Sequence, residues 1–164
     1  MPTREEAIAL FKTFLEKPRT KLPWLKKRPH LYDCAAGFSW ITGIAPKHNI
    51  VWVHELVDLA KKNGTFVAYK KGRVPQRGDA IFYDWKGTHT RTDHVAMVLK
   101  ADAHHVVAIG ADQGHVREVS YLNTGYSVIM GWGKPNKYED AAPAAETPAP
   151  IAAPTTEPAK AAKK

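Results

Sequence analysis

The chain has 164 residues, of which 44% are hydrophobic and 24% are charged, and its formal net charge is +8 at pH 7. This length suits one domain with a substantial core, and the single cysteine excludes a scaffold held by internal disulfides. No apolar run approaches membrane-spanning length, and the acidic N-terminus lacks the basic-then-apolar pattern of a signal peptide. The basic excess favours an anionic partner such as a phosphate-bearing cell wall, and it equally fits a solvated basic face.

The first half of the chain has the periodicity of helices, with clear start and stop signals. Helices are predicted over residues 3–17, 33–43 and 49–64. In the first helix, Thr3 and Glu6 have capping-box spacing, and Pro18 is expected to end it. The third helix is expected to end at two lysines followed by Gly64.

The second half changes to the two-residue period of strands. Short segments rich in β-branched and aromatic residues alternate with turn residues. Strands are predicted over residues 65–69, 79–85, 94–102, 104–110, 116–121 and 127–132. Arg77, Gly78 and Asp79 match an adhesion motif by their letters only and are interpreted as the turn into the central strand. Helices followed by strands indicate an α+β domain, with N-terminal helices packed on an antiparallel β-sheet of about five to six strands.

The composition changes sharply near the C-terminus. The last 24 residues contain ten Ala and five Pro and no aromatic residue. Such a segment buries too little apolar surface to order itself, and its prolines favour an extended chain. We therefore assign residues 1–138 to one globular domain and residues 139–164 to an Ala/Pro-rich disordered tail or linker.

Cys34 is the candidate nucleophile, because it falls in the first turn of the second predicted helix. The unpaired N–H groups and the dipole at a helix N-terminus favour a thiolate there. Asp33 would oppose a thiolate unless it caps the helix and points at the backbone. A free cysteine is more often a small buried core residue, so position alone leaves both interpretations open.

A nucleophilic thiol needs a base within hydrogen-bond reach, and eight histidines are available. His94 is favoured because it begins an otherwise apolar strand after a polar loop, where a strand can hold the ring rigidly at a cleft. His89, in that loop, is the main alternative. The returning strand of the next hairpin places Asp112, or a carbonyl near Gly110, beside His94 to orient its ring. Gln113 is less well aligned.

Four segments in order resemble a known family. DCAAGFSWITGI, VPQRGDAIFYDW, TDHVAMVL and AIGADQG are similar to the cysteine, histidine-dependent amidohydrolase/peptidase (CHAP) domain of phage endolysins. The interval is shared too, since Cys34 and His94 lie 60 residues apart. The resemblance covers roughly residues 30–134, and the Asp-Cys opening also resembles NlpC-type peptidases. It implies a papain-like fold, with Cys34 as the nucleophile and His94 as the general base.

The family usually carries a Glu-x-Asn pattern on the next strand, where this chain has Gly110 and Asp112. The resemblance therefore implies Asp112 as the third catalytic residue, without the glutamate. Trp85, Asp33 and His89 are expected to contact the substrate.

What the resemblance implies is acyl transfer at an amide of bacterial peptidoglycan, either between muramic acid and the first alanine or within the peptides. Neither a cofactor nor a metal is expected, because the histidines lack zinc-ligand spacing with a second cysteine. Scattered lysines without interleaved aromatics make a poor nucleic-acid groove. We expect a monomer that stays in a host cytoplasm before release and acts at the bacterial cell wall. The missing glutamate leaves an alternative, which is a weak or inactive CHAP-like module that binds cell wall, or a virion-associated protein.

Overall fold

The computed structural model of the chain describes residues 2–26, 33–45, 50, 52–88, 92–122, 128–135 and 138. The predicted tail 139–164 and the loop residue His89 lie outside the described residues. The helices are α1 (Arg4–Lys12), η1 (Arg19–Lys21), η2 (Pro23–Leu25), α2 (Asp33–Ile41) and α3 (Val53–Lys62), where η denotes a short 3-10 helix. The strands are β1 (Val67–Ala68), β2 (Ala80–Tyr83), β3 (His94–Ala101), β4 (His105–Asp112), β5 (His115–Leu122) and β6 (Ile129–Gly133).

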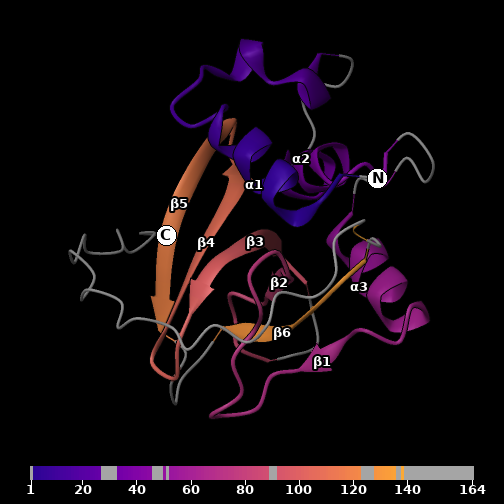
Figure 1. The fold of residues 1–164 in the computed structure, drawn as a ribbon, viewed down its shortest axis with the longest axis vertical. Coiled ribbons are helices and arrows are strands. Elements are labelled where there is room, and N and C mark those ends of the chain that lie inside the picture. The colour runs from indigo at the N-terminus through magenta and orange to yellow at the C-terminus, as the bar shows by residue number, and fades with distance from the viewer. Residues whose placement is uncertain are drawn as a thin grey trace.

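The six strands form one sheet in the order β1-β6-β2-β3-β4-β5, and all neighbouring strands are antiparallel. Helix α2 packs on β3 and β4, and α3 packs beside β6 (Figure 1). The predicted α+β class, with an antiparallel sheet of five to six strands, is confirmed. None of the helices in the described ranges is long and apolar enough to span a bilayer.

The sheet separates two apolar clusters because successive side chains of a strand point to opposite faces. On β3, Val95, Met97 and Leu99 belong to the larger cluster, which the helices cover. Ala96 and Val98 belong to the second cluster on the other face. The face on which each residue lies therefore follows from its position in the strand.

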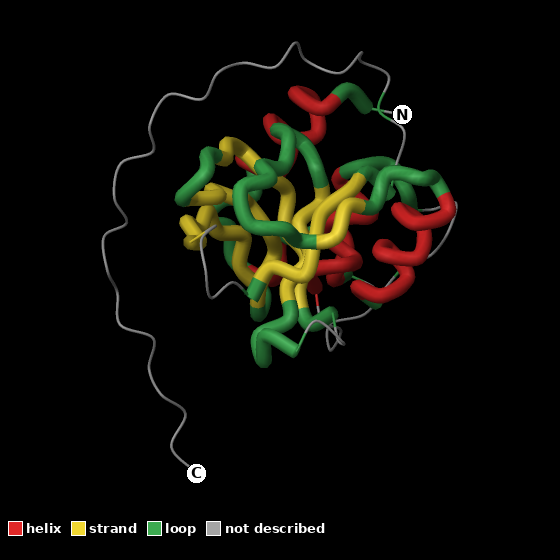
Figure 2. The backbone as a smooth tube through the Cα atoms, turned by 90° about the horizontal axis from the view of Figure 1, so that it is seen from below, coloured by secondary structure: helices red, strands yellow, loops and turns green. Residues whose placement is uncertain are grey.

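The sheet curls strongly toward the face of the second cluster. In a flat sheet, β2 and β5 would lie three strand spacings apart, about 14 Å. The ring centroids of Tyr83 on β2 and Tyr121 on β5 are only 4.6 Å apart. Figure 2 shows the strands gathered together, with helices beside them rather than on every side. This curvature brings the outer strand β5 over the end of β2.

The ends of the helices follow from local hydrogen bonds. The capping box predicted for α1 is present, because Thr3 Oγ1 accepts from Glu6 N at 3.2 Å and Glu6 Oε2 accepts from Thr3 N at 2.8 Å. The prediction that α1 continues to Pro18 is wrong, since the helix ends at Lys12. There Thr13 Oγ1 donates to the carbonyl three residues earlier at 2.7 Å, which closes the last turn.

A glycine allows α2 to approach the sheet closely. A Cβ at Gly37 would lie 3.1 Å from the Cβ of Ala111 on β4 and 3.0 Å from the ring of Trp24. Any larger residue would push the helix away from the strands. Because Gly37 is one turn after Cys34, this contact helps to fix the N-terminal end of α2 against β3 and β4.

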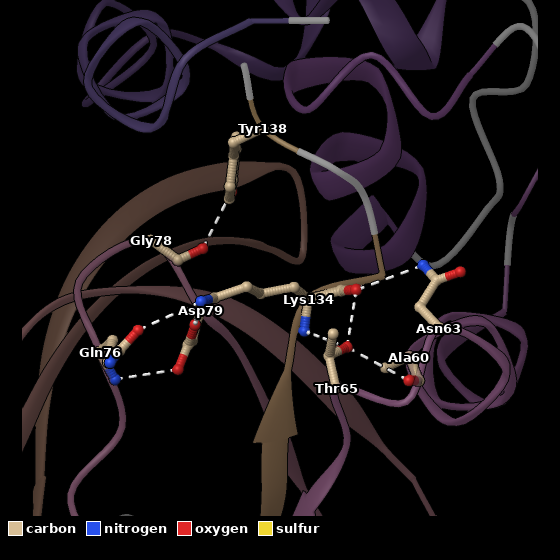
Figure 3. Close-up of polar contacts among 8 residues, drawn as sticks. All are labelled: Ala60, Asn63, Thr65, Gln76, Gly78, Asp79, Lys134 and Tyr138. Atoms are coloured by element: carbon tan, nitrogen blue, oxygen red, sulfur yellow. Dashed lines mark hydrogen bonds and ion pairs between the residues drawn. The ribbon is translucent and has the colours of Figure 1, made fainter. Parts of the chain in front are cut away.

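The end of β6 is fastened to the loops before β1 and β2 (Figure 3). Thr65 Oγ1 accepts from Lys134 N at 3.0 Å and donates to Lys134 O at 2.8 Å. Tyr138 Oη donates to the carbonyl of Gly78 at 2.9 Å. Gly78 and Asp79 are buried in the turn before β2. The Arg-Gly-Asp letters therefore form the predicted turn into the central strand.

Candidate functional site

Cys34 lies in the first turn of α2, and its side chain is 6% exposed. Backbone N–H groups of Val95, Ala35 and Cys34 itself lie where they stabilise a negative sulfur. Val95 is the second residue of β3 and directly follows His94. The tip of α2 therefore meets the start of β3.

Burial determines the protonation of the thiol. Removal from solvent raises the pKa of Cys34 to about 11, and the charge of Asp33 also raises it, whereas the N–H groups of Val95 and Ala35 oppose this. The thiol is therefore protonated at neutral pH. The expectation that the helix tip yields a thiolate is not met in the resting structure, because desolvation outweighs the helix N-terminus.

His94 is the first residue of β3, pairs with Tyr83 of β2 and is 8% exposed. Its imidazole lies 5.7 Å from the ring of Tyr83 and stacks on Trp85 at 5.7 Å. Burial lowers the pKa of His94, and the negative charge of Asp112 partly opposes that shift. The imidazole is therefore neutral at pH 7 and able to accept a proton.

Asp112 is the last residue of β4 and is exposed. It lies on the same sheet face as His94, because Ala111 and Val95 both face the helices. The charge of Asp112 acts on His94, so the structure brings these two predicted residues together. Within the described ranges, no hydrogen bond joins their side chains.

Gly110 occupies the position where the family pattern has glutamate. A Cβ there would lie 3.0 Å from the Cβ of Ala96 and 3.3 Å from the carbonyl oxygen of Val95. The ladder between β3 and β4 ends at the pair Met97 and Ile109, so Gly110 crosses β3 at close range without pairing. The absence of a side chain at this position is a packing requirement.

Asp33 is buried, and its carboxylate is used within the fold. Asp33 Oδ2 accepts from Gly114 N at 2.7 Å in the turn between β4 and β5. Gln113 and Gly114, with φ of 48° and 85°, form a two-residue hairpin turn of type I′. Burial raises the pKa of Asp33, and the Gly114 N–H opposes that shift. Asp33 therefore ties α2 to this turn, and its expected contact with a substrate stays a prediction.

The candidate nucleophile and base approach β3 from opposite faces. Cys34 belongs to the cluster between the helices and the sheet, whereas His94 packs with Tyr83 on the other face. Among the described residues, no hydrogen bond connects Cys34 Sγ to the His94 imidazole. The ring must therefore turn from its stack on Trp85 toward α2 before it can take a proton from the sulfur.

The aromatic side chains around His94 include two tyrosines that the sequence analysis did not single out. Tyr83 Oη is fully buried and has no hydrogen-bond partner in the described part of the chain. Burial and the charge of Asp112 raise the pKa of Tyr121 to about 12. The alternation along β2 places Tyr83 on the His94 face, but the proximity of Tyr121 follows from the curl of the sheet, which no local pattern encodes.

No group of three or more His, Cys, Asp or Glu side chains in the described ranges is arranged to hold a metal ion. Comparison with protein-family models, with curated proteins and with solved structures finds nothing that matches this chain.

Proposed function

We propose that this protein is a cysteine amidase or endopeptidase of the CHAP type, with a papain-like fold, that cleaves an amide bond of bacterial peptidoglycan. The observation that carries the proposal is the contact between the Cys34 sulfur and the N–H of Val95, the residue after His94. The charge of Asp112, which acts on His94, also supports it. The protein would act as a monomer at the cell wall, on a surface whose phosphates and carboxylates attract a basic domain.

The resting protonation states favour general-base catalysis. Because thiol and imidazole are both neutral at pH 7, His94 accepts the thiol proton as the Cys34 sulfur attacks the amide carbonyl carbon. The backbone N–H groups near the sulfur would stabilise the oxyanion that forms. The His94 imidazolium then gives its proton to the leaving amine, and the C–N bond breaks. Water, deprotonated by His94, hydrolyses the thioester and restores the thiol, while Asp112 favours the cationic ring.

The test is lysis of purified peptidoglycan by the full chain and by variants with retained near-ultraviolet circular dichroism. Cys34→Ala and His94→Ala should abolish the fall in turbidity, whereas His54→Ala, on the exposed side of α3, should not change it. Mass spectrometry of released fragments identifies the bond. Lysis by Cys34→Ala at the rate of the unmodified chain would refute the proposal.

The second candidate is a wall-binding module without hydrolytic activity. The raised thiol pKa and the missing Cys34–His94 hydrogen bond favour it. Sedimentation with insoluble peptidoglycan separates the two candidates. The module is supported if the unmodified chain and Cys34→Ala bind equally and neither releases fragments.

A further inference from the structure

Trp85 combines exposure with contact to the candidate base. It lies just after β2 and is 48% exposed. Its indole stacks on Tyr83 with a centroid distance of 5.2 Å and an interplanar angle of 10°, and on His94 at 5.7 Å and 28°. The stacked rings support the indole from the protein side, while much of its surface remains open to solvent. A flat apolar surface therefore stands directly beside the His94 imidazole.

Hydrogen bonds at the base of the following loop hold Trp85 in place. Its backbone N–H donates to Asp93 Oδ2 at 3.0 Å. The buried Asp84 accepts from Lys86 N at 2.9 Å and from Thr88 Oγ1 at 2.7 Å. Because the indole is already positioned, binding a ligand against it loses little conformational entropy.

The chemistry of the proposed substrate identifies the group that fits this surface. Cell-wall peptides are built mainly from small residues with single methyl groups or from charged chains. The pyranose rings of the glycan instead present a broad face of C–H groups, which packs flat on an indole. Only the amide between the muramoyl lactyl group and the first alanine lies next to a sugar ring; the amides of the stem and cross-bridge are further away.

Resting on the proposed function, we propose that Trp85 is a binding platform for the muramoyl sugar and that the bond cleaved is the muramoyl–alanine amide. The sugar stacks on the exposed indole, and the adjoining amide then lies near His94 at the start of β3, the strand that the tip of α2 approaches from the other face. This makes Trp85 a determinant of substrate specificity, because substrates without a glycan cannot stack on the indole.

Binding is measured with Cys34→Ala as the full-length background, so that no probe is cleaved. The probes are the disaccharide N-acetylglucosaminyl-N-acetylmuramic acid and the free stem pentapeptide, each followed by the indole N–H signals in NMR spectra. The disaccharide should shift the Trp85 signal, and adding Trp85→Ala should weaken its binding at least tenfold. Trp85→Tyr, which keeps a flat ring, should restore part of the binding.

The chain offers a matched control in Trp52. It is 50% exposed and stacks on a histidine, His54, at 6.5 Å and 21°, but it lies at the start of α3. Trp52→Ala should leave disaccharide binding unchanged. Equal disaccharide binding with and without Trp85, or a response of the Trp85 signal to the pentapeptide alone, would overturn the platform.

Activity distinguishes this inference from the proposed function. With the catalytic residues intact, Trp85→Ala should raise KM for glycan-linked substrate at least tenfold, and products should carry a new N-terminal alanine. If instead the disaccharide binds through Trp85 but the unmodified chain does not cleave peptidoglycan, sugar binding by Trp85 is supported and the proposed hydrolase activity is refuted. Cleavage confined to cross-bridge amides overturns the assignment of the bond while leaving the hydrolase intact.

Discussion

Asp33 Oδ2 accepts a hydrogen bond from the backbone N–H of Gly114 at 2.7 Å, although the two residues are 81 positions apart. This bond joins the first residue of α2, which precedes Cys34, to the turn that follows Asp112. The candidate nucleophile and the third catalytic candidate are therefore held by one connection between a helix and a hairpin.

Replacing Asp33 should destabilise the fold. Asp33→Ala leaves the buried Gly114 N–H without its acceptor, which we expect to lower the free energy of unfolding by about 1–3 kcal/mol. Asp33→Asn keeps an oxygen acceptor and should lose less. Urea denaturation measures both, with the exposed Asp58→Ala on α3 as the control. A loss for Asp33→Ala no larger than that of the control would contradict the structural role.

The Cys34 thiol should react slowly at neutral pH. Because its pKa is raised to about 11 by burial, the thiolate fraction is small until the solution becomes strongly alkaline. Alkylation by iodoacetamide should therefore accelerate as the pH rises from 7 toward 10, with mass spectrometry recording the modified fraction. Rapid modification at pH 6 would instead reveal a thiolate–imidazolium pair.

The activity of the proposed enzyme should persist into mildly acidic solution. Burial lowers the pKa of His94 below its usual 6.5, so the imidazole remains a neutral base until the pH falls below that value. The acidic limb of kcat/KM should accordingly have a midpoint below pH 6.5. A midpoint above pH 6.5 would mean that the charge of Asp112 outweighs desolvation.

Removing the charge of Asp112 tests its influence on the site. Since that charge raises the pKa values of His94 and Tyr121, Asp112→Asn should lower both. NMR titration of the histidine ring follows the first shift, and ultraviolet titration of tyrosinate follows the second. Asp58→Asn serves as the remote control. Unchanged titration of His94 in Asp112→Asn would show that the two groups do not interact.

Position 110 should not tolerate even a methyl group. Gly110→Ala places a Cβ against Ala96 and the Val95 carbonyl, and we expect a loss of about 1–3 kcal/mol in the free energy of unfolding. Ala96→Gly removes the nearest obstacle, so the double variant should recover much of that loss. Strictly additive effects in the double-mutant cycle would rule out the clash as the cause.

Asp79 should make stability depend on pH. Burial raises its pKa to about 6, against 3.8 when unperturbed, while Lys134 and the Gln76 N–H oppose the shift. The folded state therefore binds the proton more tightly than the unfolded chain, and the free energy of unfolding falls as the pH rises from about 4 to about 6. The lost stability is about 3 kcal/mol. Asp79→Asn should abolish this decline, as measured by urea denaturation at pH 4 and pH 7; an unaltered decline would assign it to another group.

Local patterns predicted those parts of the fold that depend on neighbouring residues. The capping box of Thr3 and Glu6 and the stop at Gly64 arise from interactions within a few positions, and the six strands follow local patterns of β-branched and aromatic residues. The early end of α1 was missed because a threonine side chain, rather than Pro18, closes its last turn.

The properties of the site depend on contacts between distant residues, and here the sequence was less informative. Helix position favoured a thiolate at Cys34, but the packing of α2 on the sheet reverses that preference. Asp33 accepts a hydrogen bond from Gly114 because the fold brings the hairpin turn beside α2, and no local pattern predicts that contact. Tyr121 lies among the aromatic rings around His94 because the sheet curls. The alternating pattern of a strand does not predict how the sheet curves.

The burial of Cys34 by the later strand β3 has a consequence for synthesis of the chain. A ribosome releases the cysteine sixty residues before His94, so the sulfur of the nascent polypeptide is open to oxidants until the sheet forms. Docking of β3 then ends that exposure. In the folded protein, the 6% exposure of the Cys34 side chain limits the access of oxidants to the sulfur.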